Sequence, residues 1–125
     1  MRYSVSVEDS HIRCEVFDRK TVEETKQFVD AIFAKLRETK MRRVLVLIRD
    51  SQPIFTVGRY QLEQIFKSAA AMVPGLRVAH VSDSKELQAS QDYIALLGRQ
   101  QGVACRALRD EQEGLKWLLS EEPAV

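Results

Sequence analysis

Acidic and hydroxyl side chains gather where the strands of this chain are expected to end. Asp50, Ser51 and Asp83 each follow a run of residues with strand character, and Arg109 follows another. In an open parallel sheet, ligands bind beyond the carboxyl ends of the strands. Carboxylate oxygens there could hold Mg²⁺, but Asp and Ser also cap the helices that begin at such points. We expect caps and candidate contacts for a partner or an anion, with no metal and no cofactor.

Histidine and cysteine are the other side chains that could do chemistry. His11 falls near the first predicted turn, and His80 falls inside a predicted strand with no carboxylate partner in view. Cys14 and Cys105 are isolated strand residues without a neighbouring histidine, so neither has the environment that activates a thiol. Glycine-rich phosphate loops and nucleophile motifs are absent from the sequence. We therefore expect a protein that is not an enzyme.

One loop combines features of an anion or modification site. Thr56 and Gly58 precede a predicted helix, whose first residues include Arg59 and Tyr60. Helix N-termini bind anions through free amide groups, Arg59 would add to the positive charge, and a phosphate on Thr56 would be tolerated there. The alternative is that Thr56 or Ser51 only caps this helix. Ser51, Thr56 and Gly58 are thus the candidate residues of a phosphorylation switch.

Five short segments have the composition of β-strands. Residues 3–7 and 12–17 are split by polar residues and predict a hairpin. Residues 44–48 are all apolar without alternation, which indicates a strand buried on both faces of a sheet. Residues 76–81 and 103–108 supply the remaining two strands. A largely parallel sheet is the arrangement that this pattern favours.

Four segments have helical features. Thr21 and Glu24 fit a capping box at the start of a helix that runs to about residue 39, and a second helix is predicted over residues 58–71. Further helices are predicted after the good capping residues Ser84 and Asp110. The order β-β-α-β-α-β-α-β-α predicts an α/β fold with a mostly parallel five-stranded sheet, four helices and helices on both faces. At 125 residues, the chain is expected to be a single domain over residues 1–125.

Composition limits the partners and the compartment. The net charge of +1 gives no field that would recruit nucleic acid. The basic residues between Lys35 and Arg43 are expected to lie at a helix end, where cations are favourable. No apolar run approaches the roughly 20 residues of a transmembrane segment. The N-terminal residues also lack the pattern of a secretory signal. We expect a cytoplasmic protein with two reduced, buried cysteines.

The chain resembles the SpoIIAA-like family, relatives of the STAS domains of anti-sigma factor antagonists. The resemblance covers nearly the whole chain and rests on element order and on three stretches of sequence. These are RVLVLIRD at residues 43–50, LRVAHVSD at residues 76–83 and ALRDEQEGLKWL at residues 107–118. It implies a STAS-like fold and a non-enzymatic regulatory module that docks on a protein partner.

The resemblance also implies two kinds of site. Antagonists of this type are switched by phosphorylation of a Ser or Thr in an Asp-Ser-Ser/Thr-Gly loop before the second helix; here the comparable stretch is Phe-Thr-Val-Gly at residues 55–58, without the Asp-Ser pair. Similar folds of the Sec14-like type bind lipids, so a small apolar ligand is the alternative. Its site would lie between the sheet and the second or third helix, with Leu62, Ile65, Phe66 and Tyr93 as the expected lining. A homodimer is a further open possibility.

Overall fold

The computed structural model describes residues 1–51 and 58–120, which contain five strands and four helices. The element order matches the predicted one, so the α/β fold class is confirmed. The strands are β1 (Arg2–Val7), β2 (Ile12–Phe17), β3 (Arg43–Arg49), β4 (Arg77–Ser82) and β5 (Ala104–Leu108). The helices are α1 (Val22–Thr39), α2 (Arg59–Met72), α3 (Lys85–Gln100) and α4 (Glu111–Leu119).

The strands lie in the sheet in the order of the sequence, β1-β2-β3-β4-β5. The predicted hairpin is present, because β1 pairs with β2 in antiparallel fashion, with Val5 opposite Cys14. The other three pairings are parallel, and His80 of β4 lies opposite Val46 of β3 and Ala107 of β5. The sheet is therefore mostly parallel, with one antiparallel edge strand.

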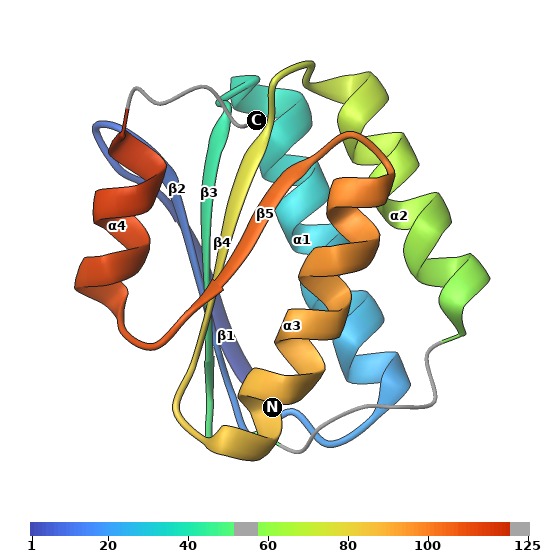
Figure 1. Cartoon of the computed structure of the whole chain (residues 1–125), viewed down its shortest axis with the longest axis vertical. Helices are drawn as coiled ribbons and strands as arrows, with labels where there is room; N and C mark the ends of the chain where they lie inside the picture. The colour runs from blue at the N-terminus through green and yellow to red at the C-terminus, as the bar shows by residue number, and fades with distance from the viewer. Residues whose placement is uncertain (52–57, 121–125) are drawn as a thin grey trace.

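Helices cover both faces of the sheet, but unequally. In Figure 1, α1, α2 and α3 lie together on one side of the sheet and α4 lies alone on the other. This arrangement explains the unbroken apolar run in β3, since Val44 to Ile48 are all buried. Alternate residues of β3 contribute to two separate cores. The larger core lies under α1–α3, and the smaller one, around Leu45 and Leu47, lies under α4.

Local capping fixes where the helices begin. The Thr21 hydroxyl accepts a hydrogen bond from the amide of Glu24, and the Glu24 carboxylate accepts one in return from the amide of Thr21. Ser84 and Asp110 cap α3 and α4 through equivalent side-chain bonds. Each cap satisfies an amide that the helix itself leaves without a partner. Ser84 and Asp110 therefore serve the helix starts, as the sequence predicted, whereas Asp50, Ser51 and Asp83 are not the N-cap residues of these helices.

Candidate functional site

Two neighbouring hollows, an outer and an inner part, lie on the three-helix side of the sheet and share some of their lining residues. The outer part is an open groove of about 570 Å³ between α1 and α2. The inner part is a cavity of about 150 Å³ between these helices, α3 and the sheet. Val29 and Phe33 of α1 and Ile65 of α2 line both parts. A molecule in the groove would thus be in contact with side chains that also enclose the cavity.

The walls of the cavity are almost entirely apolar. β3 and β4 supply the floor through Val44, Val46, Ile48 and Val78, and the three helices and Leu76, just before β4, supply the remaining apolar side chains. On α2 the lining includes Ala69, whose side chain is only a methyl group, and the half-buried Leu62. Sites of this type, with apolar walls and few polar groups, are typical of small-molecule binding.

His80 and Gln91 are two of the polar residues in the cavity wall, and both are buried, with exposed fractions of 6% and 2%. Burial lowers the pKa of His80 to about 4, and a side-chain hydrogen bond with Gln91 acts in the opposite direction. The imidazole is therefore neutral at pH 7. Among the described residues, the Nε2 atom of His80 and the Nε2 atom of Gln91 have no hydrogen-bond partner.

Arg19 brings a positive charge to the same cavity. It lies two residues after the end of β2 and is only 4% exposed. Burial lowers the pKa of its guanidinium, and the nearby charge of Glu24 opposes that shift. Its backbone amide donates a hydrogen bond of 3.1 Å to the Ser51 hydroxyl. A buried arginine in an apolar wall is uncommon, which makes Arg19 a feature that the sequence pattern did not indicate.

The structure places three of the four expected lining residues on the cavity wall: Leu62, Ile65 and Phe66. Tyr93 corrects the expectation, because it lies outside the cavity and is 47% exposed. The reason is helical phase. The buried face of α3 carries Leu87, Gln91 and Ala95 at a spacing of four residues, whereas Tyr93 is turned to the solvent side.

At the carboxyl edge of the sheet, the polar residues bond to one another and to the chain. Asp83 accepts a hydrogen bond of 3.0 Å from the amide of Asp50. The Ser51 hydroxyl donates to the carbonyl of Arg49 and accepts from the amide of Arg19, so it ties together the ends of β2 and β3. Arg109 is exposed. Since the strand order never reverses, the sheet has no switch point at which a crevice would open between these residues.

The predicted switch loop lies only partly within the described residues. Thr56 is outside them, and α2 begins after Gly58, which is its N-cap residue. Ser51 therefore does not cap this helix; instead the Gln61 side chain accepts a bond from the amide of Gly58. Arg59 forms an ion pair of 2.8 Å with Glu63 one turn further along. Tyr60 is 73% exposed and lies on the rim of the groove.

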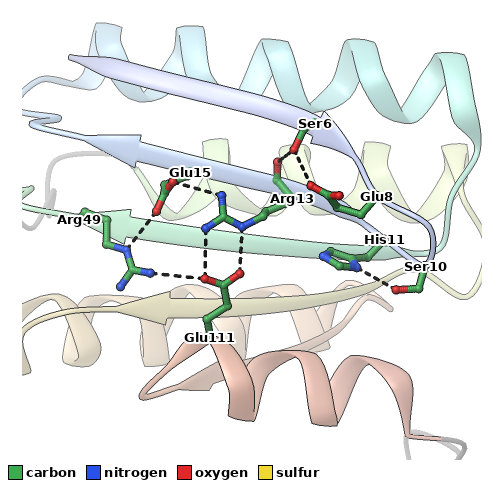
Figure 2. A network of polar contacts seen from close by, with 8 residues as sticks. All are labelled: Ser6, Glu8, Ser10, His11, Arg13, Glu15, Arg49 and Glu111. Atoms are coloured by element: carbon green, nitrogen blue, oxygen red, sulfur yellow. Dashed lines mark hydrogen bonds and ion pairs between the residues drawn. The ribbon is translucent and has the colours of Figure 1, made fainter.

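A second polar cluster, which the sequence did not reveal, lies on the α4 side of the sheet (Figure 2). Arg13 of β2 binds Glu111 through two hydrogen bonds, and Glu15 accepts bonds from both Arg13 and Arg49. The hydrogen bond from Arg13 holds the pKa of Glu111 below its usual value. Arginine side chains thus pair with both carboxylates, an arrangement suited to docking α4.

The described residues contain neither a metal-binding cluster nor a membrane-spanning helix. Within residues 1–51 and 58–120, no group of three or more His, Cys, Asp or Glu residues is placed to hold a metal ion. Across the same residues, no helix combines the length and the apolar character needed to cross a membrane. A comparison of the chain with protein-family models and with curated proteins finds no match.

His80 and Gln91 are the site residues that sequence reasoning missed as a pair. A signal for one of them was present. Gln91 occupies the same helical face as Leu87 and Ala95, and a long polar side chain on an apolar helix face needs a buried partner. The sequence could not show that His80 provides that partner, because strand register decides which β4 residue faces α3.

Proposed function

We propose that the domain is a non-enzymatic binding module whose ligand is a small, mostly apolar molecule. The observation that carries this proposal is the apolar cavity of about 150 Å³ beneath the open groove between α1 and α2. A dry apolar cavity of roughly 150 Å³ is large enough to bind benzene. An aromatic ring or a short alkyl chain would fill the inner cavity, and the groove would hold the remainder of the ligand.

The resemblance to SpoIIAA-like proteins supports the same proposal indirectly. Similar folds of the Sec14-like type bind lipids, and the cavity described above also lies between the sheet and the helices. Analogy of fold alone does not assign a function. The weight of the proposal therefore rests on the cavity. Two free, buried cysteines are compatible with the cytoplasm as the site of action.

Toluene provides a direct test, because it matches the inner cavity in size and has no polar group. We expect NMR amide shifts on addition of toluene to cluster on β3, β4 and α2. Ala69→Leu fills the cavity from α2 and should abolish these shifts, whereas Ala70→Leu, one position along and outside the cavity lining, should preserve them. Thermal unfolding of both variants checks that they fold. Saturating toluene without localised shifts would contradict the proposal.

Docking of a protein partner is the second candidate, and the exposed ring of Tyr60 on the groove rim favours it. Exposed aromatic residues beside apolar grooves are typical anchors of protein interfaces. Photo-cross-linking from the exposed position 64 in cells of the source organism should yield one dominant adduct. Tyr60→Ala should reduce it at least tenfold, while Tyr93→Ala, at an exposed tyrosine of α3, should leave it unchanged.

The same experiment distinguishes the possible occupants of the groove. A second copy of this chain would appear as an adduct of twice the mass. The switch hypothesis adds that Thr56→Glu lowers the adduct and Thr56→Ala does not, because only the first mimics a phosphate. Equal adducts from the parent protein and the Tyr60→Ala variant would rule out docking through this rim.

A further inference from the structure

His80 and Gln91 form a polar pair in a largely apolar cavity wall. His80 lies in the middle of β4, opposite Val46 and Ala107, and Gln91 lies on the inward face of α3. Both side chains are more than nine-tenths buried. Burying a polar group without a hydrogen bond destabilises a protein. Two such groups side by side in a ligand-sized cavity therefore call for an explanation.

Two buried atoms of this pair are unused. The Nε2 atoms of His80 and Gln91 have no hydrogen-bond partner among the described residues. The amide nitrogen of Gln91 is a donor, and Nε2 of a neutral imidazole is an acceptor when Nδ1 carries the proton. In that tautomer the cavity wall presents one acceptor, on His80, and one donor group, on Gln91.

A group that both donates and accepts hydrogen bonds suits the pair in either tautomer of the ring. If the ring proton is on Nε2, both unused atoms are donors, and the oxygen of a hydroxyl or an amide can accept from both. If the ring proton is on Nδ1, Nε2 of His80 accepts while the Gln91 amide donates.

We propose that the ligand of this cavity carries an uncharged hydroxyl or primary amide that binds between His80 and Gln91. The inference rests on the proposed function, since it names the polar group of the same apolar ligand. A hydroxyl donates one hydrogen bond and accepts another, and a primary amide does the same. Either group would satisfy both unused atoms at once, while the apolar part of the ligand fills the surrounding cavity.

Charged head groups fit the pair less well. With Nδ1 of His80 protonated, a carboxylate, which only accepts hydrogen bonds, would leave Nε2 of His80 without a partner, and an ammonium group, which only donates them, would leave the Gln91 amide without one. A charge would also lose its hydration on entering an apolar space. Arg19, a cation among the described lining residues, favours a carboxylate. The competing expectation is therefore an anionic ligand that binds through Arg19.

A set of benzene derivatives separates these cases at constant size. Toluene, benzyl alcohol, benzamide, benzoate and benzylammonium are titrated at pH 7 and followed by NMR. We expect benzyl alcohol and benzamide to bind at least about tenfold more tightly than benzoate and benzylammonium, consistent with one hydrogen bond of ordinary strength. Tighter binding of benzoate than of benzyl alcohol would overturn the inference in favour of Arg19.

Variants test whether the pair causes the selectivity. Gln91→Met keeps the length of the side chain and removes its polar atoms, and His80→Leu removes the ring. In each, the affinity of benzyl alcohol relative to toluene should fall about tenfold. Gln88→Met, at a half-buried position of the same helix outside the cavity lining, should leave that ratio unchanged.

The outcomes keep this inference apart from the proposed function. If toluene binds but the ratio of benzyl alcohol to toluene is the same in the parent protein and in Gln91→Met, the polar pair does not select the ligand and only this inference is wrong. If toluene and every other probe fail to bind, the proposed function is wrong and the inference falls with it. Because two independent variants are used, misfolding of His80→Leu would leave Gln91→Met to decide.

Discussion

Arg13 and Glu111 are 98 residues apart in the sequence, yet the Arg13 guanidinium donates two hydrogen bonds, of 2.9 Å and 3.1 Å, to the Glu111 carboxylate. The contact joins β2 to the first residue of α4, and Arg49 of β3 approaches the same carboxylate at 3.8 Å. Figure 2 shows that these side chains meet on the face of the sheet that α4 covers. The cluster thus fixes the N-terminal end of α4 against two strands.

Glu111→Gln should weaken the docking of α4. The pair is partly exposed, so we expect a loss of about 0.5–1 kcal/mol in the free energy of unfolding, in the range of well-formed surface pairs. Urea denaturation at pH 7 measures it. Glu113→Gln, at an exposed position of the same helix, is the matched control and should change stability by less. Equal effects of the two substitutions would mean that Arg13 contributes nothing measurable through Glu111.

The pH dependence of that loss follows from the lowered pKa of Glu111. A carboxylate whose pKa is lower in the folded state stabilises the protein above its unfolded pKa, and the contribution disappears as pH falls through the folded value. The difference between the parent protein and Glu111→Gln should therefore be complete at pH 6–7 and shrink below about pH 4.5, the ordinary value for this carboxyl. A difference that grows on acidification would contradict this assignment.

Gly98→Ala should destabilise the protein, although alanine is the better helix former by about 1 kcal/mol. A methyl group at this position of α3 would overlap Cys105 Sγ and would lie 3.1 Å from the Phe66 ring. Overpacking of this kind costs about 1–3 kcal/mol. Thermal unfolding should show a lower midpoint for Gly98→Ala and a partial recovery for the double variant with Cys105→Ala. Additive losses in the double variant would show that the thiol is not the obstacle.

The fold could be predicted from the sequence because each of its elements carries a local signal. The capping box of Thr21 and Glu24 marks the start of α1, and the unbroken apolar run in β3 indicates a strand buried on both faces of the sheet. What no local signal decides is the distribution of helices, three on one face and one on the other. The single helix on the other face, α4, follows the last described strand, and its place is set by long-range packing such as that of Gly114 against Leu45 and Val81.

The candidate site was harder to predict for the same reason. Leu62, Ile65 and Phe66 follow from helical periodicity alone, but the face of α3 was assigned wrongly at Tyr93. The polar residues at the strand ends suggested a site at the sheet edge, where the structure instead has caps and turns. Arg19, His80 and Gln91 come together only through strand register and helix placement. Nothing in a single sequence indicates that these three positions lie close together in the fold.

The two cysteines should be inert in the folded protein. Burial raises the pKa values of Cys14 and Cys105 to about 12, so neither forms a thiolate near pH 8. We expect neither thiol to react with a disulfide reagent at pH 8 until urea unfolds the chain. The variant Ser68→Cys, with a cysteine at an exposed position, should react with the reagent at once and serves as the control. Rapid reaction of one equivalent without urea would show that a thiol is accessible in the native state.

His80 should make the protein sensitive to acid in a different pH range from Glu111. Its pKa falls from the ordinary 6.5 to about 4 on folding, so the unfolded chain binds a proton first as the pH is lowered. Stability is therefore full above pH 6.5 and decreases between 6.5 and 4, by up to about 3 kcal/mol at about 1.4 kcal/mol per pH unit. His80→Leu should flatten this part of the stability profile, measured by urea denaturation from pH 4 to 7.5. Burial also lowers the pKa of His11, so His11→Asn should reduce the dependence of the free energy of unfolding on pH independently of His80. If the parent protein and His80→Leu have parallel profiles, His80 is not buried in its neutral form.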